Sequence, residues 1–321
     1  MTHGRAEIHE LLLANDLHPS RALGQNFVAD GNTVRRIVRL AGVTEGRPVV
    51  EIGAGLGSLT LALVEVGATV TAVEIDRYLV PVLRAQVEPL GVRVVEADAL
   101  TLDWTELLGP GLPGPASPAD ADAVAGGDAV AGADPGRDHG PWTLVANLPY
   151  NVAVPLVIRV LEEAPQVSSL LVMVQREVGE RLAAGAGDEA YGAVSVKVAY
   201  WVTASVVGRV SASVFIPRPR VESVLVRLDR RPDGEAPGGR VGPGDPAYDR
   251  LFSVVRGGFA HRRKMLRRSL EGLVRPEAFE ATGIRPTARA EELSLSDWER
   301  LATWHPEEEP YGTHPVHGIG R

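Results

Sequence analysis

The chain of 321 residues contains no cysteine. This absence excludes a disulfide framework, thiolate catalysis, cysteine-ligated zinc and iron–sulfur clusters. The sequence also lacks any run of about 18 uncharged apolar residues, so no transmembrane helix is expected. Residues 1–13 include Arg5, Glu7 and Glu10, and they hold no apolar stretch long enough for a secretion signal. We therefore expect a soluble, cytoplasmic protein without a membrane partner.

Acidic residues outnumber basic ones, and the formal net charge is −8. Taken alone, this balance disfavours a partner such as RNA, whose phosphates attract basic proteins. The acidic excess is concentrated, however, because residues 109–141 hold five Asp and one Arg, and residues 306–310 hold three Glu. The rest of the chain is nearly neutral. Since phosphate binding depends on local charge density, the composition permits an RNA partner.

Residues 48–228 alternate between short apolar segments and helical patterns, which predicts an α/β fold with a mostly parallel sheet. Strands are expected at Pro48–Ile52, Thr69–Ile75, Arg93–Ala97, Trp142–Ala146, Ser169–Val174, Val194–Trp201 and Ser223–Leu228. Helices are expected at Ser58–Val66, Tyr78–Val87, Val154–Glu163 and Arg176–Ala184.

Composition divides the chain into a first domain over residues 1–230 and a small helical domain over residues 248–305. Residues 109–141 are rich in Gly, Pro, Ala and Asp, which predicts a disordered insertion in the first domain. Residues 231–247 have a similar composition and indicate a linker between the domains. Residues 306–321 form an acidic, proline- and glycine-rich stretch, for which we expect a flexible tail.

A glycine-rich turn follows the first of these strands, in the sequence Glu51-Ile-Gly53-Ala-Gly55-Leu-Gly57-Ser58. Glycines between a strand and a helix let the backbone approach a ligand closely. The dinucleotide fingerprint GxGxxG fails here, because its sixth position is Ser58. The pattern ExGxGxG instead resembles the turn of S-adenosylmethionine-dependent methyltransferases. The alternative interpretation is a tight turn whose glycines serve packing only.

Acids stand at the ends of the next two strands, at Glu74 and Asp98. Because the carboxyl ends of parallel strands meet at one crevice, both acids are expected beside the same ligand. A carboxylate at Glu74 can accept both ribose hydroxyls of a nucleoside, and one at Asp98 can accept from an adenine amino group. Each acid taken singly is also compatible with a solvated strand end or a plain turn.

The fourth strand ends in Asn147-Leu148-Pro149-Tyr150, which suits the methylation of an amine. The amino nitrogen of adenine is a poor nucleophile, because its lone pair is delocalised into the ring. Two acceptors, the Asn147 side-chain oxygen and the Leu148 carbonyl, can hold that nitrogen toward a methyl donor. Pro149 fixes the turn, and Tyr150 offers a face on which a flipped base can stack. The alternative is an ordinary Asn-Pro turn after a strand.

Taken together, the sequence resembles the ribosomal RNA adenine N6,N6-dimethyltransferases of the small-subunit (KsgA/RsmA) type, from about Leu23 to Trp298. Four further stretches carry the resemblance: Leu23–Phe27, Val174–Val178, Val214–Pro219 followed by Val221 and Ser223, and Phe259–Leu266. The resemblance implies a Rossmann-like methyltransferase fold with a seven-stranded sheet and S-adenosylmethionine as cofactor. The implied substrate is two adjacent adenosines in the 3′-terminal hairpin of 16S rRNA, presented on an immature 30S subunit during ribosome biogenesis.

The resemblance also assigns roles to residues around the cofactor and the target base. It places Asn26 and the backbone at Val28 at the methionine end, Gly53 and Gly55 along the cofactor, Glu74 at the ribose, Asp98 at the adenine ring, and Asn147 beside the transferred methyl. It places Tyr150 on the target base. Phe215 either packs on that base from the other side or is a core aromatic before a proline turn; both readings stay open.

A cluster of six cations without an intervening acid lies between residues 256 and 268. Apolar residues around it keep roughly helical spacing, so we expect a basic helix that contacts RNA phosphates. The alternative is a solvated helix face. The cluster consists of Arg256, Arg262, Arg263, Lys264, Arg267 and Arg268.

Two other functions stay open on the sequence alone. An Erm-type enzyme, which methylates 23S rRNA and confers macrolide resistance, would use the same chemistry. A non-catalytic RNA-binding assembly factor could retain the same fold. A metal enzyme is not expected, because the chain has no cysteine and its closest His pair, His314 and His317, lies in the expected tail. We expect a monomer.

Overall fold

The structure is a computed structural model that describes residues 2–109, 141–231 and 240–305. The insertion and the tail expected from the sequence lie almost entirely outside the described residues, as do residues 232–239 of the expected linker. The chain divides into two compact units, Met1–Arg240 and Val241–Arg321, which are described one at a time.

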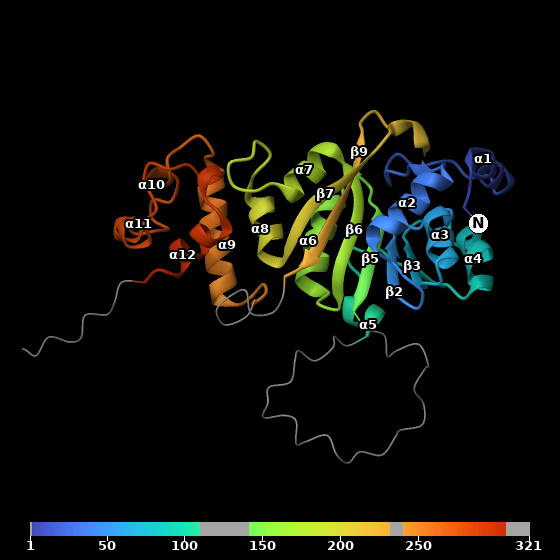
Figure 1. The fold of residues 1–321 in the computed structure, drawn as a ribbon, viewed down its shortest axis with the longest axis horizontal. Helices are drawn as coiled ribbons and strands as arrows, with labels where there is room; N and C mark the ends of the chain where they lie inside the picture. The colour runs from blue at the N-terminus through green and yellow to red at the C-terminus, as the bar shows by residue number, and fades with distance from the viewer. Residues whose placement is uncertain (1, 110–140, 232–239, 306–321) are drawn as a thin grey trace, which may run out of the picture. The chain divides into compact units, whose positions relative to one another are not determined.

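Unit 1 is built on a seven-stranded sheet with the strand order β4-β3-β2-β5-β6-β9-β7 (Figure 1). The strands from β4 to β6 run parallel to their neighbours, and β9 runs antiparallel to both β6 and β7. The expected seven-stranded, mostly parallel sheet is thereby confirmed. Its strands are β2 (Pro48–Ile52), β3 (Thr69–Glu74), β4 (Arg93–Glu96), β5 (Trp142–Asn147), β6 (Val167–Gln175), β7 (Val202–Val210) and β9 (Ser223–Arg230).

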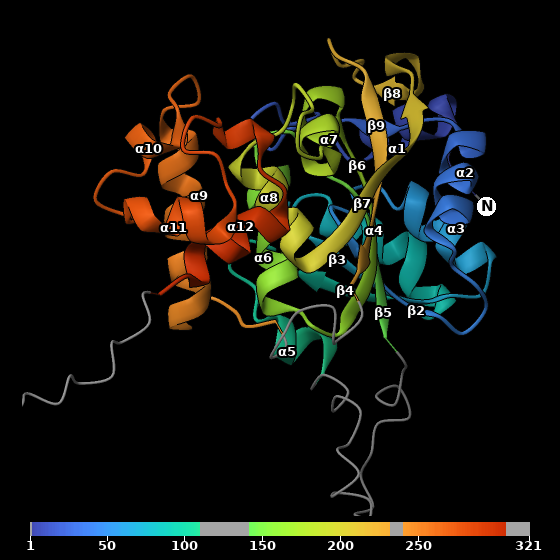
Figure 2. The same cartoon turned by 60° about the vertical axis from the view of Figure 1, so that its left-hand side comes forward.

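Helices cover both faces of this sheet, because successive residues of its central strands point to opposite sides. In β5, Leu144 and Ala146 belong to one buried cluster, and Val145 belongs to the other. Figure 2 shows the two helical layers. The first cluster is covered by α5 (Trp104–Leu108), α6 (Ala153–Glu163), α7 (Arg176–Ala183) and α8 (Ala193–Trp201), and the second by α2 (Gly31–Ala41), α3 (Ser58–Glu65) and α4 (Val80–Val87).

A two-stranded sheet joins the start of unit 1 to a segment near its end. Strand β1 (Phe27–Val28) pairs antiparallel with β8 (Phe215–Ile216), so that Phe27 lies opposite Ile216 and Val28 opposite Phe215. Helix α1 (Arg5–Ala14) packs on this sheet through Ile8 and Leu12. The short 3₁₀ helices of unit 1 are η1 (Glu88–Leu90) and η2 (Ala212–Val214).

One element predicted from the sequence is wrong. The strand expected at Val194–Trp201 is helix α8, and the strand that fills this place in the sheet, β7, follows it. Alternating Val residues suggested a strand, but the Gly192 amide donates to Ser195 Oγ at 3.1 Å and starts a helix. Strand β7 escaped prediction because it is an edge strand with many exposed residues. Every other strand and helix predicted for unit 1 ends within two residues of the observed one.

Arg230, the last residue of β9, ends helix α6 with its guanidinium group. Its nitrogens donate to the carbonyls of Val160, Leu161 and Ala164 at 3.2, 2.8 and 3.0 Å, and Nε donates to Val167 at 3.0 Å. These carbonyls lie at or just beyond the carboxyl end of α6, where a positive charge is favoured. One side chain therefore ties the antiparallel strand to the helix layer.

Replacing Arg230 by methionine, which keeps the apolar stem and removes the guanidinium, should lower the free energy of unfolding by about 3 kcal/mol. Urea unfolding monitored by circular dichroism measures this loss. Arg84→Met is the control, because Arg84 pairs with Glu88 at 3.5 Å where both side chains are about half exposed, and its loss should cost less than about 0.5 kcal/mol. Equal midpoints for the two variants would contradict the proposed cap.

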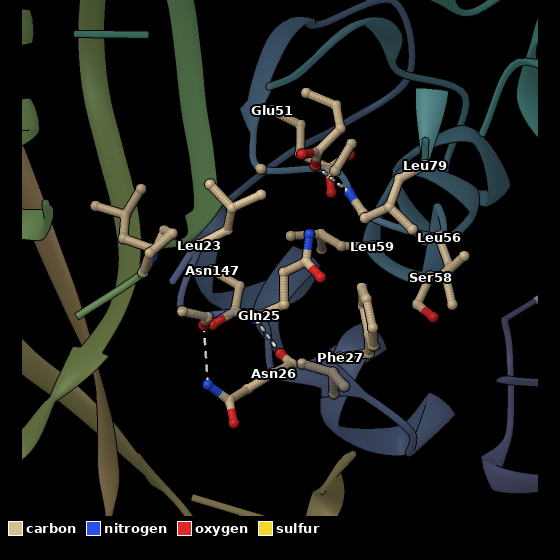
Figure 3. A pocket seen from close by; sticks show the side chains of 18 of the residues that line it. Leu23, Gln25, Asn26, Phe27, Glu51, Leu56, Ser58, Leu59, Leu79 and Asn147 are labelled. Carbon is tan, nitrogen blue, oxygen red and sulfur yellow. Dashed lines mark hydrogen bonds between the residues drawn. The ribbon is translucent and has the colours of Figure 1, made fainter. Parts of the chain in front are cut away.

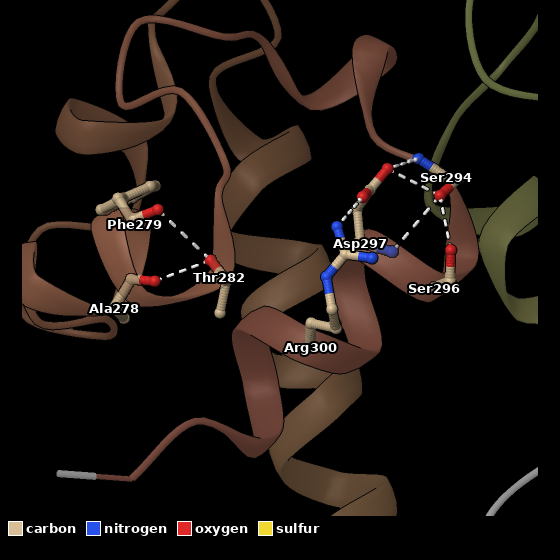
Figure 4. Close-up of polar contacts among 7 residues, drawn as sticks. All are labelled: Ala278, Phe279, Thr282, Ser294, Ser296, Asp297 and Arg300. Atoms are coloured by element: carbon tan, nitrogen blue, oxygen red, sulfur yellow. Dashed lines mark hydrogen bonds and ion pairs between the residues drawn. The ribbon is translucent and has the colours of Figure 1, made fainter.

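Unit 2 is helical and packs around Trp298, against whose ring Gly258 lies so closely that a Cβ would come within 2.4 Å. Its last helix is fixed by reciprocal bonds, since the Ser294 amide donates to Asp297 Oδ2 at 2.9 Å and the Asp297 amide donates to Ser294 Oγ at 3.3 Å (Figure 4). The elements are α9 (Pro246–Ala260), α10 (Leu266–Ser269), α11 (Pro276–Thr282), η3 (Ala290–Glu292) and α12 (Leu295–Thr303).

The continuous basic helix expected around residues 256–268 is also wrong. Helix α9 ends at Ala260, a turn follows, and α10 begins at Leu266. The amides of Leu266 and Arg267 donate to the carbonyls of Ala288 and Pro286, at 2.8 and 3.1 Å. Because these amides bind a neighbouring loop, they cannot extend α9.

Candidate functional site

Two adjoining cavities lie at the carboxyl ends of β2, β3, β4 and β5. Figure 3 shows the first of them. Four residues line both of them: Leu23, Gly53, Ile75 and Pro149. The first cavity brings together most of the residues singled out in the sequence, namely Asn26, Val28, Gly53, Gly55, Glu74, Asn147, Leu148, Pro149 and Tyr150. The second adds Asp98.

The glycine turn forms the floor of the first cavity. Gly53, Gly55 and Gly57 have φ values of 73°, 59° and 86°, which L side chains rarely adopt. A Cβ at Gly55 would lie 3.1 Å from the ring of Phe27. The Gly55 amide donates to Glu74 Oε2 at 2.7 Å, which fixes the turn to the end of β3. The turn therefore presents bare backbone to the cavity, as a close-fitting ligand requires.

Gly55→Ala should weaken S-adenosylmethionine binding about 10-fold or more, because the new methyl group strains the turn and displaces Phe27. Isothermal titration calorimetry measures the affinity. Gly46→Ala is a matched control, since Gly46 has a similar φ of 72° but no atom within 4 Å of its Cβ position. If both variants bind like the wild type, the close approach at Gly55 has no role in cofactor binding.

Glu74 is buried and holds the loop after β3. Its Oε1 accepts from the amides of Ile75 and Asp76, at 3.0 and 2.9 Å, while Oε2 accepts from Gly55. Burial raises the pKa of this carboxyl group, and the backbone donors oppose that shift. The carboxylate thus has a fixed orientation at the cavity wall.

Glu51 also lines the first cavity, and sequence reasoning gave it no role. It is 1% exposed, and Thr60 Oγ1 donates to its Oε2 at 2.6 Å. Burial raises the pKa of Glu51 to about 8, against the opposing effect of the Thr60 hydrogen bond. The signal in the sequence that could have singled out Glu51 was its position as the acid of the ExGxGxG pattern. A buried acid with this pKa is proton-bound at neutral pH.

The second cavity combines one carboxylate with apolar walls. Asp98 Oδ1 accepts from the Leu100 amide at 2.9 Å, and its other oxygen has no hydrogen-bond donor within the described ranges. Ile75 remains 48% exposed between Glu74 and Asp98. An exposed apolar side chain beside a free acceptor suits a flat, aminated ring such as adenine.

Asn147 presents its oxygen to the first cavity, because its amide nitrogen is already engaged. Nδ2 donates to the Asn26 carbonyl at 2.9 Å. The Leu148 amide donates to Met173 at 3.1 Å, which fixes the next peptide. Neither Asn147 Oδ1 nor the Leu148 carbonyl has a donor in the parts of the chain that the structure describes. The two acceptors are therefore available to a ligand.

Tyr150 lines the first cavity, and its hydroxyl lies 3.2 Å from Ser223 Oγ. Ser223 is 1% exposed and begins β9. Its contact with Tyr150 could not be predicted from the sequence, because the two residues are 73 positions apart.

Phe215 is likewise 1% exposed, belongs to the core cluster beneath α2 and α3, and lines neither cavity. The structure therefore places Phe215 in the core.

All six cations of the basic cluster are exposed in unit 2. Acids outside the cluster approach two of them. Glu291 Oε2, from η3, lies 2.8 Å from Arg262 Nε, and Glu271 Oε2, three residues after Arg268, lies 3.9 Å from Arg268 Nη1. In the folded chain, acidic side chains therefore lie beside the cluster that the sequence alone shows as purely basic.

A doubly wound sheet with a glycine turn after β2, acids after β3 and β4, and free acceptors after β5 has the features of an S-adenosylmethionine-dependent methyltransferase. Residues 18–306 match the family model described as "Ribosomal RNA adenine dimethylase". The chain belongs to this family. It is an enzyme, an adenine dimethyltransferase whose methyl donor is S-adenosylmethionine.

Curated relatives extend over nearly the whole chain. The ribosomal RNA small subunit methyltransferase A of Leifsonia xyli is 43% identical, covering 93% of this chain and 97% of that protein. The protein of the same name from Bifidobacterium adolescentis is 41% identical, with coverages of 93% and 92%.

Solved structures share the fold. The 23S rRNA methyltransferase ErmE has a TM-score of 0.60 at 24% identity, with coverage of 86% of this chain and 98% of that chain. A dimethyladenosine transferase from Plasmodium falciparum has a TM-score of 0.62 at 20% identity, with coverages of 85% and 94%. Within the described ranges, no helix is both long and apolar enough to cross a bilayer. Those ranges also contain no group of three His, Asp or Glu side chains that could hold a metal ion.

Proposed function

We propose that this enzyme dimethylates N6 of two adjacent adenosines in the 3′-terminal hairpin of 16S rRNA, and so takes part in small-subunit biogenesis. The observation that carries the chemistry is the pair of free acceptors, Asn147 Oδ1 and the Leu148 carbonyl, at the cavity. The choice of RNA rests on the relatives named as small subunit methyltransferases, which match over nearly their full length. The substrate is an immature 30S subunit, and the enzyme acts as a cytoplasmic monomer.

The proposed cofactor contacts follow the order of the strand ends. Asn26 and the Val28 backbone bind the methionine end, Gly53 and Gly55 border the cofactor, Glu74 binds the ribose, and Asp98 binds the adenine amino group. When bound, S-adenosylmethionine supplies a methyl group on a positively charged sulfur, which needs no further activation. The exposed face of Ile75 packs against the adenine ring.

The proposed chemistry of the target base is mainly positioning. Asn147 Oδ1 and the Leu148 carbonyl accept the two N–H groups of the adenine amine and orient its nitrogen toward the methyl donor. Tyr150, held by Ser223, stacks on the flipped base. The amine loses a proton to water as the new bond forms, so no strong general base is required. The second transfer uses the remaining N–H group.

We further propose that the six exposed cations of unit 2 contact phosphates of the ribosomal RNA. Arginine suits this role because its planar guanidinium group can donate two parallel hydrogen bonds to one phosphate. The strongest claim belongs to the other four cations, since the ion pairs described above involve Arg262 and Arg268. These four are Arg256, Arg263, Lys264 and Arg267.

Methyl transfer to small subunits that lack dimethyladenosine tests the proposal. Tritiated S-adenosylmethionine should label 16S rRNA in these subunits, and primer extension should stop at two adjacent adenosines near its 3′ end. Large subunits and naked 23S rRNA serve as the parallel substrates. Labelling of 23S rRNA alone would replace the proposal with the Erm-type reading, and absence of both labelling and cofactor binding would favour an assembly factor.

A further inference from the structure

The segment of residues 20–28 forms one wall of the first cavity, although it precedes the sheet in sequence; we call it the entry segment. It supplies two of the proposed cofactor contacts, Asn26 and Val28. Five other residues of the segment also line the cavities. Leu23, Gly24, Gln25 and Phe27 line the first cavity, and Ala22 and Leu23 line the second. The geometry of the cofactor site therefore depends on what holds the entry segment in place.

Besides the pairing of Phe27 and Val28 with β8, two contacts near the end of β5 fasten the entry segment. The Asn26 carbonyl accepts from Asn147 Nδ2 at 2.9 Å. Gly24 lies so close to Pro149 that a Cβ would come within 3.0 Å of the proline Cβ. Both of these contacts are made by the end of β5 and the loop after it, and the pairing with β8 holds only residues 27 and 28. A separate contact is therefore needed to hold the segment at the end of β3.

Gln25 holds that opposite side. Its Nε2 donates at 2.7 Å to Oδ2 of Asp76, which follows the end of β3. Its Oε1 accepts from the Ser20 amide at 2.7 Å, and its own amide donates to the Ser20 carbonyl at 3.1 Å. One side chain thus closes the loop of the entry segment and ties that loop to β3.

Asp76 is itself well anchored. Its Oδ1 accepts from the Tyr78 amide at 2.9 Å, and its amide donates to Glu74 Oε1 at 2.9 Å. The acceptor for Gln25 therefore sits on the same short loop as Glu74, the proposed ribose ligand. A hydrogen bond from an amide to a carboxylate is charge-assisted and stronger than a neutral pair.

We propose that the hydrogen bond between Gln25 and Asp76, the Gln25–Asp76 bridge, closes the entry segment over the cofactor and positions Asn26 and Val28 for it. Both are positioning residues, since they act through the segment and not on the reacting atoms. The proposal rests on the cofactor contacts proposed above. It predicts that loss of the bridge weakens cofactor binding while the chemical step, which depends on Asn147 and Leu148, continues.

Gln25→Ala and Asp76→Ala should each raise the KM for S-adenosylmethionine about 10-fold, with kcat changed less than about 3-fold. The double variant should resemble the single variants, because the second change removes a bond already lost. Asp76→Asn keeps an acceptor oxygen and should stay within about 3-fold of the wild type. Gln86→Ala, on α4 and outside the residues that line the cavities, is the control.

Two binding measurements made without RNA separate this proposal from the proposed function. Calorimetry with S-adenosylmethionine should show the same 10-fold loss in Gln25→Ala, and amide hydrogen exchange should accelerate in residues 20–28 while urea stability stays unchanged. Wild-type affinity and exchange in Gln25→Ala, or losses that add in the double variant, would overturn the bridge. Failure of the proposed function would appear instead as normal cofactor binding without labelling of 16S rRNA.

Discussion

Asn147→Ala should lower kcat for methyl transfer about 10²–10³-fold, the loss typical of removing one preorganised polar group from a reacting centre. The substitution removes the acceptor Oδ1 and leaves the target amine held by the Leu148 carbonyl alone. It also removes the donor to the Asn26 carbonyl. The entry segment keeps its other contacts, so the affinity for S-adenosylmethionine should fall by only a few fold.

Single-turnover labelling of under-methylated small subunits measures the chemical step, and calorimetry measures the affinity. Asn147→Asp keeps an acceptor but places a carboxylate oxygen against the Asn26 carbonyl. Its rate should lie between those of the wild type and Asn147→Ala. Asn32→Ala is the control, because this exposed asparagine lies on α2, outside the residues that line the cavities. A rate for Asn147→Ala within 3-fold of the wild type would refute the assigned role.

The second large effect concerns Glu51, which should make the protein without cofactor less stable as the pH rises. Its pKa is about 8 in the folded chain, against 4.5 for the unfolded one. The folded state therefore retains a proton that the unfolded state releases. Below pH 4.5 the contribution of this carboxyl group to the free energy of unfolding is at its maximum. That contribution is lost as the pH rises from 4.5 to about 8. The total change is roughly 5 kcal/mol.

Glu51→Gln should abolish this dependence, because the amide keeps an acceptor for Thr60 and carries no charge at any pH. The variant should exceed the wild type in the free energy of unfolding above pH 8 by several kcal/mol, and the difference should shrink toward pH 5. Urea titrations at five pH values measure it. Glu88→Gln, an exposed helix residue, is the control. Parallel pH profiles for wild type and Glu51→Gln would show that Glu51 ionises normally.

Short-range patterns in the sequence predicted where the strands end and which functional side chains lie at those ends. Gly53, Glu74, Asp98 and Asn147 each lie at or just beyond the end of a strand that was placed within two residues, and a parallel sheet brings such positions to one edge. The cavity could therefore be outlined without the structure. Glu51 shows the limit, because its burial, and hence its pKa, depends on the helices packed around it.

The elements that escaped prediction depend on contacts between distant residues. Strand β7 is recognised by its pairing with β9 and not by its own pattern. The break after α9 is caused by carbonyls at Pro286 and Ala288, which no local spacing around residue 260 reveals. The partners Gln25 and Asp76 are 51 residues apart, and both are polar residues in loops, where the sequence has no periodicity to read.

The small sheet of β1 and β8 also sets the order in which a growing chain can assemble its site. Strands β2, β3, β4 and β5 are synthesised early and can pair with one another. Phe27 and Val28, however, have no strand partner until Ile216 and Phe215 have left the ribosome. The wall formed by residues 20–28 is therefore completed only when most of unit 1 has been made. An enzyme that modifies ribosomes thus completes its own donor site late in its own translation.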